Sequence, residues 1–217
     1  MGPDLNMILR RSFFSIFLAA ILFANTIPLA ASADHNGKTA EQFIEGLADA
    51  AIGALTDKEA TREKRVERFR ELLGHNFDVE LIGKWVMGRH WRAASDTEKT
   101  EYMALFEDLI VITYVDRFDQ YSGEALKVVN TVMDPGKDAI VYSELVRPNS
   151  KDVIRVDWRV RQNGDEYRIV DVYVEGISMG QTQRSEFASV IKQKGGTVEG
   201  LLQVLRTKVS SLQQAQK

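Results

Sequence analysis

The sequence contains no cysteine and only three histidines among its 217 residues. A chain without cysteine can form no disulfide and offers neither a thiolate nucleophile nor a soft metal ligand. The histidines His35, His75 and His90 are widely separated, and no His-Glu-x-x-His pattern or acidic ladder accompanies them. The sequence therefore does not indicate a zinc or calcium site.

The chain also lacks a strong excess of either charge. It carries 28 basic and 31 acidic residues, and its formal net charge is −3. Proteins that bind nucleic acid usually present a basic patch, and none is visible here. We therefore expect no nucleic-acid partner.

The longest apolar run lies near the N-terminus, from Phe13 to Ala24. It follows the basic pair Arg10-Arg11 and precedes Ala31-Ser32-Ala33, which fits a small-residue cleavage site. The run is short for a bilayer span, so a cleaved signal peptide is favoured over a membrane anchor. We expect residues 1–33 to be this signal and residues 34–217 to form a single domain in the periplasm, with full secretion as the alternative.

Helical periodicity covers the first half of that domain. Apolar residues recur at intervals of three and four in residues 38–56 and 58–74, which predicts two amphipathic helices. Asp78 is a predicted N-cap for a third, short helix. The sequence Ser95-Asp96-Thr97-Glu98 is a capping box, and it predicts the start of a long helix that reaches about Tyr121.

One segment of that long helix, Leu109–Val115, is apolar on every side. A helix on the surface would show a polar face. The segment therefore predicts either a central core helix between two layers or the wall of an internal apolar space.

The pattern then changes to the two-residue period of strands, predicted at residues 126–133, 138–147, 152–162 and 166–174. Asn163-Gly164 favours a tight hairpin, and the other connections are also short, so the strands are expected to form an antiparallel meander. Two helices follow, at residues 178–194 and 197–212. Helices, then a sheet, then helices predict an α+β fold.

The third strand has the clearest alternation. Apolar and charged residues alternate along this strand, which predicts one apolar face and one solvated face. The apolar set is Ile154, Val156, Trp158 and Val160, and the charged set is Arg155, Asp157, Arg159 and Arg161.

Gly176-x-Ser178-x-Gly180 fits the nucleophile elbow of serine hydrolases. That motif needs a parallel α/β sheet and a histidine that follows the serine, whereas all three histidines precede Ser178. Ser178 and Gln181 also fit a capping box at the start of a helix. We therefore favour a helix cap and keep the hydrolase as the minor alternative.

Asp171 is the other candidate for chemistry, because it lies in the last predicted strand. A carboxylate there could act as a general base in an open, cone-shaped sheet. Pairing with an arginine across the sheet, Arg155 or Arg159, is the favoured interpretation.

Several motifs together resemble one known family. They include Tyr167–Val172, Glu175-Gly176-Ile177-Ser178 and Gln183-Arg184-Ser185-Glu186-Phe187, together with Gly88-Arg89-His90-Trp91-Arg92, Thr113-Tyr114, Tyr121-Ser122-Gly123, Gly195-Gly196 and Gly200-Leu201-Leu202. On these residues the chain resembles the periplasmic phospholipid-binding proteins of the Mla system, the MlaC-like or toluene-tolerance auxiliary family. The resemblance covers about residues 38–207.

The resemblance implies an NTF2-like twisted antiparallel sheet of four strands with a helical subdomain around an apolar pocket. It implies a lipid carrier, not an enzyme, that holds phospholipid as cargo and uses no cofactor. Its implied partners are the lipid-binding ring of an inner-membrane ABC transporter and an outer-membrane lipoprotein–porin complex. A related branch is associated with hopanoid biosynthesis and remains the alternative.

We expect the pocket wall to consist of apolar residues from both layers, since apolar pockets with few polar groups bind apolar ligands. The helical candidates are Val86, Trp91, Phe106, Leu109, Ile110 and Thr113. The strand candidates, chosen by alternation, are Val128, Ile140, Tyr142, Ile154, Val156, Trp158, Val172 and Val174.

Overall fold

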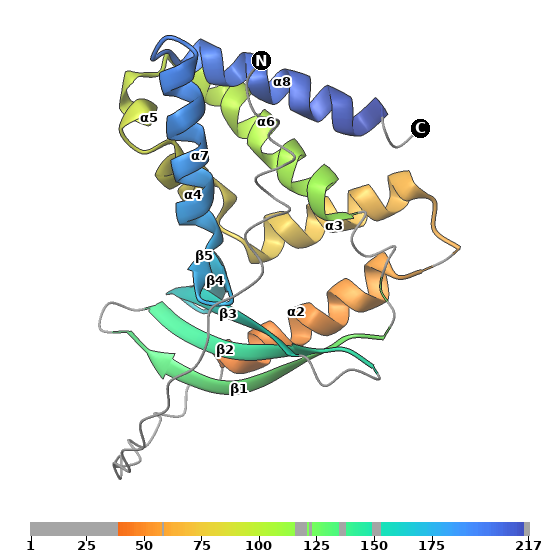
Figure 1. Ribbon diagram of the computed structural model, residues 1–217. Coiled ribbons are helices and arrows are strands. Elements are labelled where there is room, and N and C mark those ends of the chain that lie inside the picture. The colour runs from red at the N-terminus through yellow and green to blue at the C-terminus, as the bar shows by residue number, and fades with distance from the viewer. Residues whose placement is uncertain are drawn as a thin grey trace. The chain divides into compact units, whose positions relative to one another are not determined.

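A computed structural model describes residues 39–57, 59–115, 121, 123–134, 138–148 and 153–214 (Figure 1). These residues belong to one compact unit, Asn36–Lys217. The predicted signal peptide lies outside the described residues, as do residues 116–120 at the predicted end of the long helix.

The sheet is an antiparallel meander in the order β1-β2-β3-β4-β5. This confirms the α+β prediction, although the sheet has five strands instead of four. The fifth is the two-residue β5, which is too short for a periodic pattern to reveal. The strands are β1 (Ala125–Met133), β2 (Asp138–Val146), β3 (Val153–Asn163), β4 (Glu166–Val174) and β5 (Ile177–Ser178).

The hairpin between β3 and β4 forms where Asn163-Gly164 predicts it. Gly164 has φ +65°, a left-handed conformation that glycine adopts without a Cβ penalty. Two register shifts, at Val128/Asn130 in β1 and at Arg159/Val160 in β3, mark irregularities in the ladder. Such bulges increase the local twist of a sheet.

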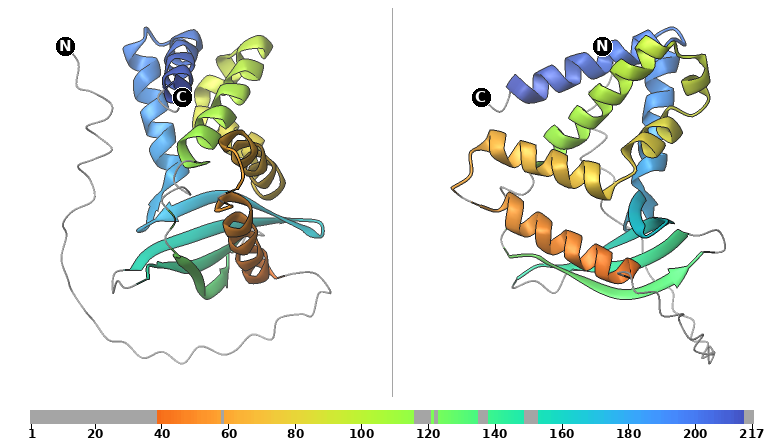
Figure 2. Two further views of the ribbon diagram at one scale, coloured as in Figure 1. Left: turned by 90° about the vertical axis from the view of Figure 1, so that its right-hand side faces the viewer. Right: turned by 180° about the vertical axis from the view of Figure 1, so that it is seen from behind.

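Helix α2 (Ala40–Leu55) lies across one face of the sheet, which we call the inner face (Figures 1 and 2). Its Ala40 and Ile44 are buried there, and the buried sheet residues they join in one cluster are Ala139, Val141, Val160 and Ile169. Thr39 and Gln42 form a reciprocal capping box that fixes where this helix begins.

The remaining helices form a second layer. They are α3 (Arg62–Asn76), α4 (Val79–Met87), α5 (Arg89–Ala93), α6 (Asp96–Val115), α7 (Met179–Gln193) and α8 (Val198–Gln214). This layer reaches the sheet where α3, α4 and α7 contact β4 (Figure 2). Helices α4, α6, α7 and α8 share a second buried cluster, in which Tyr102, Phe106 and Phe187 pack ring against ring. The five-residue α5 had no signal in the sequence.

Two predicted helix starts are confirmed. The Asp78 side chain accepts a hydrogen bond from the Leu81 backbone N–H, and Ser95 and Glu98 cap each other reciprocally. The apolar segment at the end of α6 lies partly in the core: α6 packs against α3, α4 and α8, and its Val111, Ile112 and Val115 are buried. The segment is not enclosed on every side, because Tyr114 is exposed.

Candidate functional site

Strand register gathers six of the eight predicted strand residues on the inner face. Residues directly opposite each other on neighbouring antiparallel strands share a face, and Trp158 lies opposite Val141 and Val172, both packed with α2. By the same register, the six that share this face are Val128, Ile154, Val156, Trp158, Val172 and Val174.

The prediction that Ile140 and Tyr142 lie on the inner face is wrong. Ile140 lies opposite Arg159 and Tyr142 opposite Asp157, so both side chains are on the charged outer face. Strand β2 carries apolar residues at both alternating sets of positions, so its sequence alone does not show which set is inner. The inner set contains small Ala139 and Ser143, and the larger Ile140 and Tyr142 face outward.

The predicted helical residues lie in the other cluster. Val86 and Phe106 are buried members of the helical core, and Trp91, Leu109 and Ile110 pack against it. Val128, Trp158 and Val172 pack instead against the α2–sheet cluster. The structure therefore does not bring these helical and strand residues into one hydrophobic cluster, and their role as lipid contacts stays a prediction.

A strip of the inner face is covered only in part. Leu145, Ile154, Val156 and Val174 are half-buried apolar residues that lie on this face but outside both clusters. Thr113 in α6 is also half-buried. We call the four sheet residues the apolar strip. Leu145 is not among the predicted wall residues. It lies opposite Ile154 in the β2–β3 pair and therefore shares the inner face with it.

The one polar side chain beside this strip has its hydrogen bonds made. Ser143 is fully buried between Val128 and Val156. Its hydroxyl donates to the Val156 carbonyl and accepts from the Trp158 indole N–H at 3.0 Å. A buried polar group that is paired in this way adds little polarity to its surroundings, so the strip keeps an apolar character.

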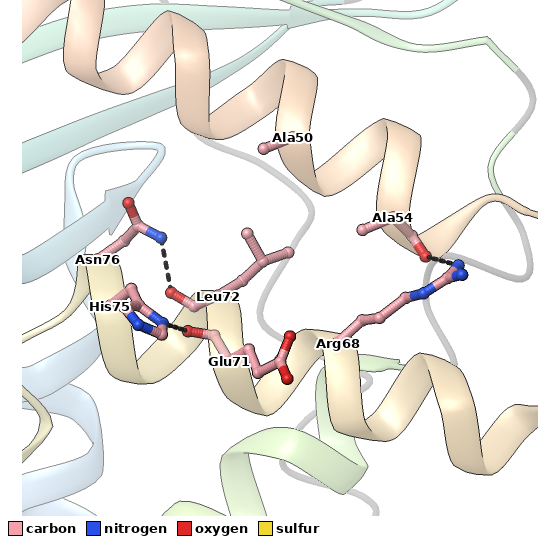
Figure 3. Close-up of a pocket in the computed structure, with 7 residues that line it drawn as sticks. All are labelled: Ala50, Ala54, Arg68, Glu71, Leu72, His75 and Asn76. Carbon is pink, nitrogen blue, oxygen red and sulfur yellow. Dashed lines mark hydrogen bonds between the residues drawn. The ribbon is translucent and has the colours of Figure 1, made fainter.

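A separate hollow of about 360 Å³ opens between α2 and α3 (Figure 3). Arg68 on its rim donates to the Ala54 carbonyl at 3.0 Å and to Asp57 at 3.1 Å, and His75 bonds the Glu71 carbonyl. None of the fourteen predicted wall residues lines it. The lining residues are Ala50, Ala54, Arg68, Glu71, Leu72, His75 and Asn76.

The geometry around Ser178 is that of a helix cap. Its hydroxyl donates to Asp171 Oδ2 at 2.6 Å and accepts from the Gln181 backbone N–H at 2.9 Å. The Gln181 side chain reaches Ser185 at 3.5 Å, so the predicted capping box is present only in its serine half. His75 and His90 bond elsewhere, to the Glu71 carbonyl and to Arg89, and neither forms a Ser-His pair with Ser178.

Asp171 also caps the same helix. One of its oxygens accepts from the Gly180 backbone N–H at 3.1 Å, in addition to the bond from Ser178. The favoured pairing with an arginine is wrong, because Arg155 pairs with Asp157 and Arg159 pairs with Asp134 and Asp138. The carboxylate supplies the acceptors that a helix N-terminus lacks.

The turn before this cap explains the Glu175-Gly176 motif. Glu175 and Gly176 have φ +52° and +78°, the left-handed pair that a tight hairpin turn needs. The Glu175 backbone N–H donates to the Arg155 carbonyl at 2.9 Å, and its carboxylate accepts from the Arg155 N–H at 2.6 Å. The Glu175 side chain thereby accepts the hydrogen bond that a backbone carbonyl would accept if β4 continued beside β3.

The outer face carries two buried carboxylates, Asp138 and Asp157. Asp138 is 2% exposed and accepts hydrogen bonds from Arg161 at 2.7 and 2.9 Å and from Arg159 at 2.8 Å. The Arg161 bond, with Arg159 adding to it, holds the pKa of this carboxyl below its ordinary value, although burial acts in the opposite direction. These groups stabilise the outer face of the sheet, which is the face opposite to the apolar strip.

Among the described residues, no three histidine, aspartate or glutamate side chains are arranged to hold a metal ion. In the same part of the chain, no helix has both the length and the apolar character needed to cross a bilayer.

Fold and site together define an α+β protein whose sheet has an apolar, partly covered face. Ser178, which a nucleophile elbow would use as the nucleophile, is the N-cap of α7 in this protein. The family model for MlaC protein matches residues 45–207. The chain belongs to the MlaC family, which confirms the resemblance seen in its motifs.

Two relatives support this assignment. The toluene tolerance protein Ttg2D of Pseudomonas putida is 24% identical over 183 residues, which cover 82% of this chain and 85% of that protein. The phospholipid-binding protein from Ralstonia solanacearum, solved in complex with a phospholipid, superposes with a TM-score of 0.70 at 19% identity. That match covers 81% of this chain and 99% of the other, and at this identity it shows a shared fold.

Proposed function

We propose that this protein is a periplasmic carrier that holds the acyl chains of a phospholipid against the inner face of its sheet. The apolar strip is the observation that carries the proposal, because its four residues are available to an apolar ligand without breaking either core cluster. Family membership and the phospholipid bound by the Ralstonia solanacearum protein support the same ligand class.

Transfer energies explain why a carrier is needed. Two acyl chains contain on the order of 30 methylenes, and each costs about 0.8 kcal/mol to expose to water. A free phospholipid therefore does not cross an aqueous compartment at a useful rate. A protein whose pocket matches the bilayer in polarity can load and unload, because the free energy difference between its two apolar environments is small.

The proposal includes the route as well as the cargo. Residues 1–33 direct export and are removed, and the mature carrier exchanges lipid with an inner-membrane ABC transporter ring and an outer-membrane lipoprotein–porin complex. Members of this family are lipid-binding proteins and not an enzyme class. The name of the Pseudomonas putida relative, a toluene tolerance protein, fits a role in maintaining an outer barrier.

A matched pair of variants in β3 tests the lipid site. Val156 belongs to the apolar strip, whereas Val153 is on the same strand with its side chain on the outer face. We expect Val156→Asp to abolish uptake of fluorescent phospholipid from vesicles, because a carboxylate in an acyl site is strongly disfavoured. Val153→Asp should bind lipid normally.

Circular dichroism of both variants guards against a folding defect. If a folded Val156→Asp protein binds lipid as well as the unchanged protein does, the acyl chains lie elsewhere. The hollow between α2 and α3 would then be the next site to substitute, at Leu72 and Ala50.

A further inference from the structure

Trp85 in α4 is 42% exposed, although Val86 and Met87 beside it are fully buried. Burying a tryptophan normally stabilises a fold by more than burying any other side chain of this helix would. The indole ring is nevertheless held at the surface, where it adds less to stability. A large aromatic residue kept exposed by specific contacts points to an interaction with something outside the chain.

Three features of the sequence fix the position of this ring. The Arg184 guanidinium carbon lies 5.0 Å from the ring centroid, and Arg184 donates to the Trp85 carbonyl at 3.2 Å. A Cβ atom on Gly180 would lie 3.0 Å from the ring, and one on Gly88 would lie 3.0 Å from the Arg184 guanidinium. A side chain at either position would require the ring or the guanidinium to shift by a few tenths of an ångström, and Gly88 also has a left-handed φ of +58°.

A second exposed apolar residue lies nearby in the chain. Ile177 is 51% exposed. It precedes Gly180 by three residues, so the two Cα atoms are at most about 11 Å apart. Gly180 is the residue against which the Trp85 ring packs. Ile177 is also paired with Val174 across β4 and β5. It therefore extends the apolar strip to the exposed edge of the sheet.

Cationic side chains accompany these two residues. Arg184 stacks on Trp85, Arg89 is exposed immediately after Gly88, and Arg155 Nη2 would lie 3.1 Å from a Cβ on Gly176, beside Ile177. The Arg155 guanidinium pairs with Asp157 at 3.0 Å, and the Glu175 carboxylate accepts the Arg155 backbone N–H. Among the described residues, Arg89 and Arg184 are therefore the cations of this surface that have no acidic partner. We call Trp85, Arg89, Arg155, Ile177 and Arg184 the joint surface.

We propose that the joint surface contacts the headgroup layer of an anionic lipid bilayer. Tryptophan is favoured at the boundary between headgroups and acyl chains, and arginine binds phosphate oxygens in a bidentate manner. The whole chain is mildly acidic, so attraction to an anionic surface must come from a local cluster such as this one. The inference rests on the proposed carrier function, since it places the membrane contact where the apolar strip reaches the sheet edge.

Sedimentation of the mature protein with phosphatidylglycerol vesicles, and with phosphatidylcholine vesicles in parallel, tests the inference. We expect binding to the anionic vesicles that weakens as salt is added. Arg89→Gln should lower the partition coefficient about fivefold, as expected for one cation near an anionic surface. Ile177→Ser should lower it on vesicles of either composition, because it removes apolar contact area.

Two exposed positions outside the joint surface serve as controls. Val132→Ser removes an exposed apolar side chain from β1, and Arg147→Gln removes an exposed cation after β2. Both should bind vesicles like the unchanged protein. No sedimentation with anionic vesicles, or an equal loss in the controls, would overturn the assignment of this surface.

Lipid content measured by mass spectrometry on the same samples separates this inference from the carrier proposal. Protein that contains phospholipid but does not sediment with vesicles would support the carrier function and contradict the membrane contact. A photo-crosslinking residue at position 177 gives a second readout in cells. Crosslinks to lipid support the membrane contact, and crosslinks to protein alone would make the joint surface a protein docking site and contradict it.

Discussion

The hydroxyl of Ser178 lies 2.6 Å from Asp171 Oδ2, and both side chains cap the start of α7. The same serine is the centre of a Gly-x-Ser-x-Gly sequence that fits a nucleophile elbow. Its hydrogen bonds join the last strands of the sheet to the helical layer. The Gly-x-Ser-x-Gly sequence of this chain is therefore explained by its structural role. Gly176 belongs to the turn, Ser178 and Asp171 cap α7, and Gly180 packs against the Trp85 ring.

Replacing Ser178 by alanine tests that explanation. Loss of an N-cap side chain typically costs about 1 kcal/mol, so urea unfolding should show a loss of that size. Lipid uptake by the folded variant should be unchanged. An ester-hydrolysing activity in the unchanged protein that disappears in Ser178→Ala would restore the hydrolase hypothesis.

Gly180 should be intolerant of even one added methyl group. The Cβ of Gly180→Ala would lie 3.0 Å from the Trp85 ring and 3.1 Å from Asp171 Oδ1. Overpacking of this kind costs about 1–3 kcal/mol, which thermal unfolding would detect as a lower midpoint.

Gly53→Ala in α2 is the matched control, since no atom lies within 4 Å of the added Cβ. Alanine in an exposed helix interior is favoured over glycine by about 0.5–1 kcal/mol. The two glycine substitutions should therefore shift the midpoint in opposite directions. A stabilised Gly180→Ala protein would show that Trp85 is free to move away.

Stability should fall in acid partly because of Asp138. Its folded-state pKa is lowered by the hydrogen bonds from Arg161 and Arg159. The carboxylate therefore contributes stability that is fully present above its unfolded-state pKa, about 3.9, and is lost as the pH falls through the lower folded-state value. Asp138→Asn should be less stable at neutral pH and should lose less of its stability as the pH falls.

Urea titrations of both proteins at neutral pH and between pH 4 and about 2 measure this difference. If the two curves fall in parallel over that range, the acid sensitivity belongs to other carboxylates.

Removal of the N-terminal segment is a further prediction. The Ala31-Ser32-Ala33 sequence should direct cleavage after Ala33, so N-terminal sequencing of protein from a periplasmic fraction should begin at Asp34. A membrane-bound product that retains Arg10-Arg11 would instead show an uncleaved anchor.

Local patterns in the sequence predict most of the secondary structure. Asp78 and Ser95 begin helices because their side chains satisfy free backbone N–H groups. The alternation in β3 assigns its inner face correctly because charged residues occupy every second position. In β2 that contrast is missing, and Ile140 and Tyr142 were placed on the wrong face for this reason.

Contacts between distant segments are the part that local patterns do not contain. The strand period places Asp171 on the same face as Ile169, whereas the register shift at Arg159/Val160 brings it opposite Arg159. Only the folded chain shows that α7 begins within hydrogen-bonding distance of Asp171. The separation of Phe106 and Trp158 into different clusters likewise depends on where α2 and α6 pack. Two-residue β5 and five-residue α5 are shorter than any periodic signal.

Native mass spectrometry of the mature protein, purified without detergent from its own periplasm, tests the central claim most directly. The carrier account predicts a species whose excess mass equals one glycerophospholipid with two acyl chains, released on denaturation and depleted in Val156→Asp. A hopanoid mass would place the chain in the related branch of the same family. Protein that is consistently free of lipid, and that takes none from vesicles, would contradict the account.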